Sequence, residues 1–245
     1  MLLAALLLAV AIGAYAHFVR HDARVFSRFK TVTETQARQR VFLRWTWQAA
    51  AYFLGMPLIG LALLGRIEAL WSFPAEFAPA ATDMPEIGDM SAGFIGALAG
   101  AVFAGGVIGG VLASRRRKPA KPRKAIDIDA MIPRNRAETL RVALLGANAA
   151  LTEEVCFRLY IPLLFMPLGA SPWIGFGAAA LLFGAMHRYQ GWLGVVLTSL
   201  LGMMFAFAYL ASGGLALPIL LHLLLNWNGL ILRPMIKALA SRRAD

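Results

Sequence analysis

Hydrophobic and polar residues follow one another along this chain in long blocks. Apolar runs of roughly 20 residues match the ~30 Å hydrocarbon core of a bilayer when they are helical. Because every backbone polar group must be satisfied inside lipid, the pattern predicts an all-α bundle of about seven membrane spans. The expected spans cover about residues 2–19, 47–64, 92–113, 142–168, 172–187, 191–211 and 215–235.

The fourth block is interrupted by charge. Within Thr152–Arg158, two adjacent carboxylates, Glu153 and Glu154, precede an arginine, Arg158. One ionisable side chain at the centre of a membrane helix costs about 2.5–3.5 kcal/mol on insertion scales. Three of them in so short a stretch indicate either a buried ion pair that holds helices together or a reaction centre.

Composition agrees with the membrane class. The chain of 245 residues is 59% hydrophobic and 15% charged, whereas soluble domains average about 25% charged residues. No long polar segment offers a second core, so we expect one compact bundle. The single cysteine, Cys156, excludes an intrachain disulfide framework and is expected to be a structural filler.

The net charge of +11 is unevenly distributed. All but two of the Lys and Arg residues fall in four regions, whereas the segment 65–90 holds one basic residue and five acids. By the positive-inside rule the basic regions are cytoplasmic, which places the N-terminus outside and the C-terminus inside. We expect these regions to attract anionic lipid, and we predict no nucleic-acid partner. The basic regions are 20–44, 114–141, Arg188 and the tail from Arg233.

The first apolar run has a competing interpretation as a secretory signal peptide, because Ala14–Tyr15–Ala16 resembles a cleavage site. No basic residue precedes the run and seven follow it, which favours an uncleaved anchor. In the third run, glycines four residues apart are expected to let helices pack closely within the bundle. We divide the chain into N-terminal spans 1–139, catalytic helices 140–236 and a basic tail 237–245.

Two later polar pairs also interrupt apolar helix. Phe183 and His187 are four residues apart, as are His222 and Asn226, so each pair projects from one helix face. The same spacing lets Glu154 pair with Arg158. Glu153 lies about 100° further around the axis and is left to face a cavity.

These residue types indicate hydrolysis. A carboxylate beside neutral histidines in a dry pocket can activate water, and the His222–Asn226 pair supplies donors for a developing oxyanion. The reaction class suggested is the attack of water on an amide bond.

The three motifs together resemble the CPBP family of intramembrane proteases, which includes the eukaryotic CAAX-prenyl endopeptidase and bacterial relatives. The resemblance covers about residues 140–232. It implies that Glu153 and His187 activate the water, that His222 and Asn226 stabilise the oxyanion, and that Glu154 and Arg158 support the site. It further implies a membrane-associated protein or peptide substrate and a bacterial cell membrane as the location. Independently of the resemblance, the predicted topology places His187 at the cytoplasmic end of its span, so we expect the site to open toward the cytoplasm.

Three alternatives stay open at this point. Glu153, His187 and His222 could instead bind a catalytic zinc ion with water as fourth ligand, although we favour a mechanism with no cofactor. The chain could be a catalytically idle relative that acts as a scaffold or immunity factor. It could also be a small transporter that uses the same groups as a proton relay.

Overall fold

The computed structural model describes residues 1–84, 100, 104–105, 107–108, 111 and 129–242. The described part consists of helices and connecting turns. The α-helices are α1 (Leu2–Phe29), α2 (Thr35–Ala50), α3 (Met56–Leu63), α4 (Ala78–Thr82), α6 (Arg136–Glu154), α7 (Ile161–Phe165), α8 (Pro172–Met186), α9 (Gly191–Ser212), α10 (Ala216–Trp227) and α11 (Arg233–Arg242). The 3₁₀ helices are η2 (Ile67–Leu70), η3 (Ala75–Phe77), η4 (Asp129–Met131), η6 (Met166–Leu168) and η7 (Arg188–Gln190), and the π-helices are η1 (Ala51–Gly55), η5 (Val155–Tyr160) and η8 (Asn228–Leu232).

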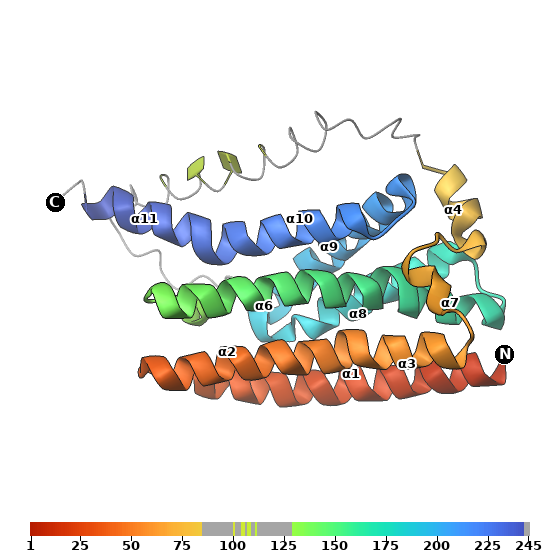
Figure 1. Ribbon diagram of the computed structural model, residues 1–245, viewed down its shortest axis with the longest axis horizontal. Coiled ribbons are helices and arrows are strands. Elements are labelled where there is room, and N and C mark those ends of the chain that lie inside the picture. The colour runs from red at the N-terminus through yellow and green to blue at the C-terminus, as the bar shows by residue number, and fades with distance from the viewer. Residues whose placement is uncertain (85–99, 101–103, 106, 109–110, 112–128, 243–245) are drawn as a thin grey trace.

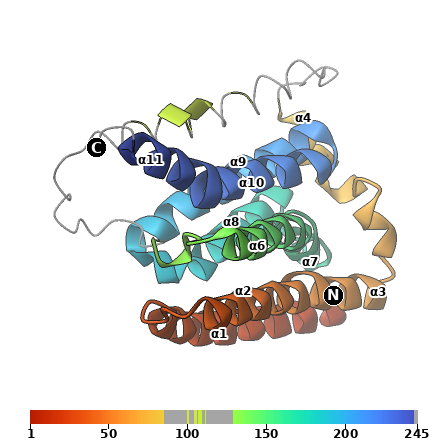
Figure 2. The ribbon, with the colours of Figure 1, turned by 60° about the vertical axis from the view of Figure 1, so that its left-hand side comes forward.

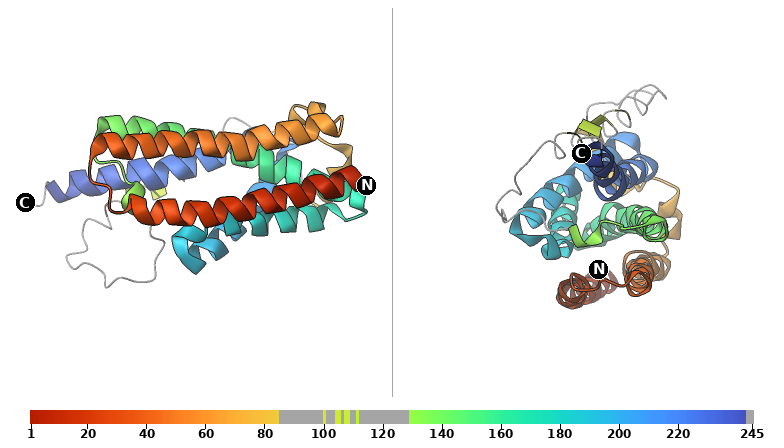
Figure 3. Two further views of the ribbon diagram at one scale, coloured as in Figure 1. Left: turned by 90° about the horizontal axis from the view of Figure 1, so that it is seen from below. Right: turned by 90° about the vertical axis from the view of Figure 1, so that its left-hand side faces the viewer.

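The long helices lie nearly along one axis (Figure 1). Each π-helix joins two α-helices into one rod, so that α2–η1–α3, α6–η5–α7 and α10–η8–α11 run without a break. The α1 helix and the α2–α3 rod form one layer, α6 to α8 lie in the middle, and α9 to α11 cover the opposite face (Figure 2). The two ends of the chain lie at opposite ends of the bundle (Figure 3).

The all-α membrane class is confirmed. Within the described residues, four helical segments are long and apolar enough to cross a membrane: 2–29, 35–63, 188–212 and 216–240; α8 is apolar but shorter. The rod that carries Glu153, Glu154 and Arg158 is not among the four. The third predicted span, with its glycine pairs, lies almost wholly outside the described residues, so the count of seven spans, their orientation and the domain division stay predictions.

Two helices extend beyond the predicted apolar spans. The first span was expected to end at residue 19, but α1 continues to Phe29; the second was expected to begin at residue 47, but α2 starts at Thr35. The extensions are stabilised by aromatic packing between α1 and α2, which a hydropathy profile does not reveal. Phe29 meets the Trp45 ring at 4.9 Å and the Phe42 ring at 5.2 Å between ring centres.

A ladder of aromatic rings joins the N-terminal helices to the middle layer. Tyr15 of α1 stacks on Phe53 of η1 at 5.6 Å, and Phe53 lies 5.7 Å from Phe157 of η5. The hydroxyl of Tyr15 also hydrogen-bonds the buried Cys156 sulfur at 2.8 Å, which agrees with a structural role for that cysteine. The close approach of α3 to η5 needs Gly60, because a Cβ at that position would lie 2.4 Å from the Tyr160 ring.

The start of α6 is held by a buried ion pair. The Arg38 Nε donates to both carboxylate oxygens of Glu138 at 3.1 Å, and both side chains are fully buried. Arg38 also donates to the carbonyls of Ala130 and Ile132 at 2.9 and 3.2 Å, while Asn135 caps the helix through the Glu138 amide at 3.0 Å. This network sets α6 against α2, and therefore the position of everything that α6 carries.

At the other end of the bundle, we expect a pH-dependent contribution to stability from Glu76. The Arg66 guanidinium beside it donates two hydrogen bonds and holds the pKa of that carboxyl below its usual value. A carboxyl whose folded-state pKa is lowered adds stability above its unfolded pKa, about 4.3, and loses it as the pH falls through the folded pKa. Thermal unfolding of the wild type and Glu76→Gln should therefore differ at pH 6, and the difference should shrink as the pH falls below about 4 toward the lowered folded pKa. A difference that stays constant down to pH 3 would contradict this account.

Candidate active site

The two adjacent carboxylates stand at the end of α6, directly before a π-helical segment, η5. π-Helical turns inside α-helices are frequent at functional sites. Arg158 in η5 reaches back to Glu154, with Nε and Oε2 separated by 2.7 Å and both side chains fully buried. The predicted pairing of Glu154 with Arg158 is thus present in the structure.

Glu154 has a second partner that the sequence did not predict. Its Oε1 lies 2.8 Å from Nδ1 of His222 on α10, so one carboxylate bridges Arg158 and His222. The predicted pair of Glu154 and Arg158 is therefore part of a larger set that also includes His222. The bridge orients the imidazole, because the hydrogen bond at Nδ1 leaves Nε2 as the nitrogen available on the other side of the ring.

Aromatic rings hold His222 from two sides. Phe205 stacks on the imidazole at 5.0 Å between ring centres, and Phe183 meets it edge-on at 5.8 Å. In this orientation His222 Nε2 lies 3.9 Å from Oε2 of Glu153. Among the described residues that Oε2 is buried with no hydrogen-bond partner. The predicted free carboxylate thus faces an imidazole across a short gap.

His187 directly follows α8. Its Nδ1 lies 2.8 Å from the carbonyl oxygen of Phe183, the residue that shares its helix face. A carbonyl can only accept, so Nδ1 carries the proton and Nε2 of the neutral ring keeps its lone pair. His187 therefore has the tautomer that a base or water acceptor at Nε2 requires.

Asn226 is placed by the contact between α10 and α6. Its Nδ2 donates to the Gly146 carbonyl at 3.1 Å, and the neighbouring Trp227 indole donates to the Ala143 carbonyl at 3.0 Å. An amide nitrogen carries two hydrogens, so one N–H of Asn226 is left for a ligand. Gly146 allows this approach, since a Cβ there would already touch Asn226 and Trp227 at 3.4 Å.

These side chains line one cavity of about 120 Å³, room for a few water molecules at about 30 Å³ each. The four residues predicted to be catalytic all contribute to its wall. Glu154 and Arg158 are not part of the lining; Glu154 hydrogen-bonds His222, which is, and Arg158 pairs with Glu154. The complete lining comprises Phe18, Asp22, Phe26, Trp45, Ala49, Phe53, Met131, Leu145, Gly146, Ala149, Glu153, Met186, His187, Tyr189, His222, Asn226 and Leu230.

One wall of the cavity was missed by sequence reasoning. It comes from α1, α2 and η1, and it includes a second carboxylate, Asp22. The available signal was its spacing, because Phe18, Asp22 and Phe26 are four residues apart and share a helix face. Tyr189 also lines the cavity.

The proposed zinc ligands do not form a metal site in the described part of the chain. Glu153 and His222 approach each other, but no set of three His, Cys, Asp or Glu side chains there is placed to hold a metal ion. A catalytic zinc site needs three protein ligands about 2.0–2.2 Å from the metal when they are nitrogen or oxygen. We therefore derive no step through a metal.

The fold and this buried acid–histidine cluster define a helical integral membrane protein with an internal cavity. Residues 135–228 match the family model described as type II CAAX prenyl endopeptidase Rce1-like, which confirms the resemblance to the CPBP family over this segment. All seven motif residues lie inside it, whereas α1 and α2 lie outside. Neither a curated protein nor a solved structure matches the chain.

Proposed function

We propose that the protein is an intramembrane endopeptidase that hydrolyses a peptide bond of a membrane-associated substrate. The supporting observation is that Glu153 of α6, His187 at the end of α8, and His222 and Asn226 of α10 line a single cavity. The match of residues 135–228 to a protease family supports the same conclusion.

In the proposed reaction, the Glu153 carboxylate takes a proton from a water molecule that also hydrogen-bonds Nε2 of His187. The oxygen attacks the carbonyl carbon, and the carbonyl oxygen becomes an oxyanion. Glu153 then passes its proton to the amide nitrogen, the C–N bond breaks, and an acid and an amine are released. General base catalysis of this kind typically supplies about 10²–10⁴-fold in rate.

The oxyanion is held by the N–H of Asn226 and by Nε2 of His222. To donate from Nε2 while Nδ1 donates to Glu154, His222 acts as an imidazolium. The carboxylates of Glu154, at 2.8 Å from Nδ1, and Glu153, at 3.9 Å from Nε2, offset that charge. Arg158 in turn compensates Glu154, so the charges of the buried set alternate.

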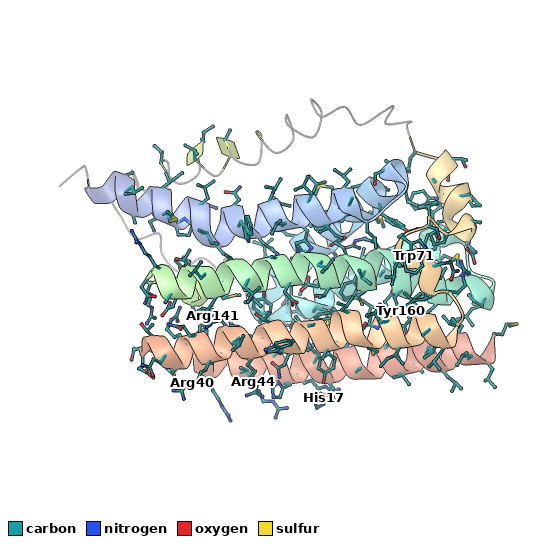
Figure 4. All side chains as sticks on the ribbon, in the orientation of Figure 1. His17, Arg40, Arg44, Trp71, Arg141 and Tyr160 are labelled. Atoms are coloured by element: carbon teal, nitrogen blue, oxygen red, sulfur yellow. The ribbon has the colours of Figure 1, made fainter. Side chains whose placement is uncertain are left out.

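We propose that the cavity opens toward the cytoplasm. Arg40, Arg44 and Arg141 lie toward the end of the bundle at which α2 and α6 begin (Figure 4). By the positive-inside rule this end is cytoplasmic. Trp45 of α2, directly beside this basic stretch, lines the cavity. We keep a bacterial cell membrane as the expected location.

Anionic lipid is the second proposed partner. At the basic end, a shallow groove of about 250 Å³ is lined by Gln36, Gln39, Arg40, Leu43 and Arg141. Two guanidinium groups with two amides match a lipid phosphate. The same basic residues beside membrane helices give no reason to propose nucleic acid.

The purified protein in liposomes, incubated with membrane peptides and profiled by mass spectrometry, tests the function. We expect new peptide ends that appear only with active protein. Proton-coupled flux without any cleavage would support the transporter alternative, and neither signal would support the idle relative.

Asn226→Ala is expected to lower kcat about 100-fold with little change in KM, because an oxyanion donor acts mainly in the transition state. Asn148→Ala is the matched control. Asn148 lies on α6 and, like Asn226, donates a hydrogen bond to a backbone carbonyl of a neighbouring helix, in its case Thr46 at 3.0 Å. Asn148 does not line the cavity. Equal kinetic losses in both variants would place Asn226 among packing residues.

Treatment with 1,10-phenanthroline is expected to leave the rate of cleavage unchanged, because the proposed reaction uses only side chains of the chain itself. Metal content measured on the same samples provides the control. A chelator-induced loss that zinc restores would establish the zinc alternative for Glu153, His187 and His222 instead.

A further inference from the structure

Asp22 is an ionisable residue on the inward face of a membrane helix. It lies between Phe18 and Phe26 at intervals of four residues, and all three line the cavity. Ionisable residues in such positions are costly and tend to have functional roles. The reaction proposed above assigns roles to four residues but none to Asp22. The four are Glu153, His187, His222 and Asn226.

The charge of Asp22 is not compensated by the cavity. Among the described residues Asp22 has no ion pair, and the lining of the cavity contains neither lysine nor arginine. Asp22 interacts electrostatically with another acid of the cavity wall, Glu153. Because His222 offsets the charge of Glu153 in the proposed reaction, the negative potential of this part of the wall comes from Asp22.

The wall around Asp22 is aromatic. Phe26 lies 5.0 Å from Tyr189 and 6.3 Å from Trp45 between ring centres, and all three rings line the cavity. Aromatic faces attract cations, by about 0.5–1 kcal/mol at exposed sites and more when desolvated. The Phe26 ring already accepts one, because the Lys30 ammonium lies 5.1 Å from its centre.

We propose that Asp22, with Phe26, Trp45 and Tyr189, forms a subsite for a positively charged substrate group, a Lys or Arg side chain close to the scissile bond. A cation would satisfy the carboxylate and rest against the aromatic faces in one position. Its interpretation as a substrate subsite rests on the proposed function. The subsite would give a helix outside the family match control over which peptides are cleaved.

Binding tests this without requiring cleavage. The full-length His187→Ala protein, which keeps both acids, is placed in nanodiscs. Two fluorescein-labelled peptides with blocked ends and the same leucine–alanine sequence carry either one central Lys or one central Gln. By fluorescence anisotropy the Lys peptide should bind roughly tenfold more tightly, and Asp22→Asn should reduce that ratio below about twofold. Asp129→Asn removes an exposed acid outside the cavity and should leave the ratio unchanged.

Equal affinity of the two peptides in the protein that keeps Asp22, including no binding of either, would overturn the subsite. So would an equal loss of preference in Asp22→Asn and Asp129→Asn, which would assign the effect to net charge. A tenfold preference for the Lys peptide, together with a wild-type protein that cleaves no peptide, would support the cation subsite and refute the proposed protease function. In an active protein, a fall in kcat of equal size for both peptides in Asp22→Asn would make Asp22 a proton donor and overturn the proposal.

Discussion

Glu153→Gln is expected to reduce cleavage about 10³-fold or more while the protein stays folded, because the amide keeps the shape of the side chain but cannot accept a proton from water. The carboxylate has no ion-pair partner closer than His222 Nε2 at 3.9 Å, and His222 keeps the Glu154 carboxylate at 2.8 Å as its counter-ion when Glu153 is neutralised. We expect the thermal midpoint to stay the same or to rise. The measurement is cleavage of a peptide found by membrane profiling, with circular dichroism on the same preparation.

Glu68→Gln is the matched control for this experiment. Glu68 is half-exposed and belongs to the Arg66 cluster, away from the cavity, so its loss should leave the rate within about twofold. His187→Ala should reduce the rate of cleavage by an intermediate factor, roughly 10²-fold. Full activity of Glu153→Gln would refute the assignment of Glu153 as the base and, with it, the proposed mechanism.

Arg38→Ala is expected to destabilise the protein by about 3–5 kcal/mol, because it leaves the Glu138 carboxylate buried without its cation. Arg38 also rests on the Phe29 ring, 4.6 Å from its centre, so the truncation removes packing between α1 and α2 as well. The double variant Arg38→Met with Glu138→Leu should recover most of the loss, since no unpaired charge remains. Thermal unfolding in detergent measures both effects.

The exposed pair of Arg40 and Glu34 offers a matched comparison. Its atoms are 3.9 Å apart, and the Arg40 side chain is 77% exposed, so Arg40→Ala should cost less than about 1 kcal/mol. Similar losses for Arg38→Ala and Arg40→Ala would show that the buried network at the start of α6 does not hold the two layers together.

The stability and activity experiments address different parts of the molecule. Arg38 and Glu138 position α6, and α6 carries Glu153 and Gly146 to the cavity. A weakened network should therefore also lower activity, in proportion to the unfolded fraction. Glu153→Gln should lower activity with no such fraction, which separates chemistry from folding.

Local periodicity predicted what lies within one helix. The separation of Glu154 and Arg158 by four residues predicted their pairing, and the separation of His222 and Asn226 predicted a shared face; both features depend only on 3.6 residues per turn. Hydropathy predicted the class for a similar reason, because bilayer thickness sets the length of an apolar run. The bounds of α8 and α9 agreed closely with expectation, since short turns follow both.

Other features depend on contacts between segments far apart in the chain. The Glu154–His222 bond joins residues 68 positions apart, and the Arg38–Glu138 pair joins residues 100 apart; no local pattern specifies either partner. The continuation of α1 to Phe29 depends on rings of α2. The π-helix after Glu154 likewise has no signal in the apolar pattern.

The sequence by itself determined that this is a helical membrane protein and which polar side chains interrupt its apolar segments, because burial in lipid makes each of them costly. The tertiary structure alone decided that Glu153 faces His222, that Glu154 is shared between two partners, and that Asp22 enters the same cavity. Those relations arise where α1, α6 and α10 pack, and packing depends on the shapes of several surfaces at once, which one helix's sequence does not contain.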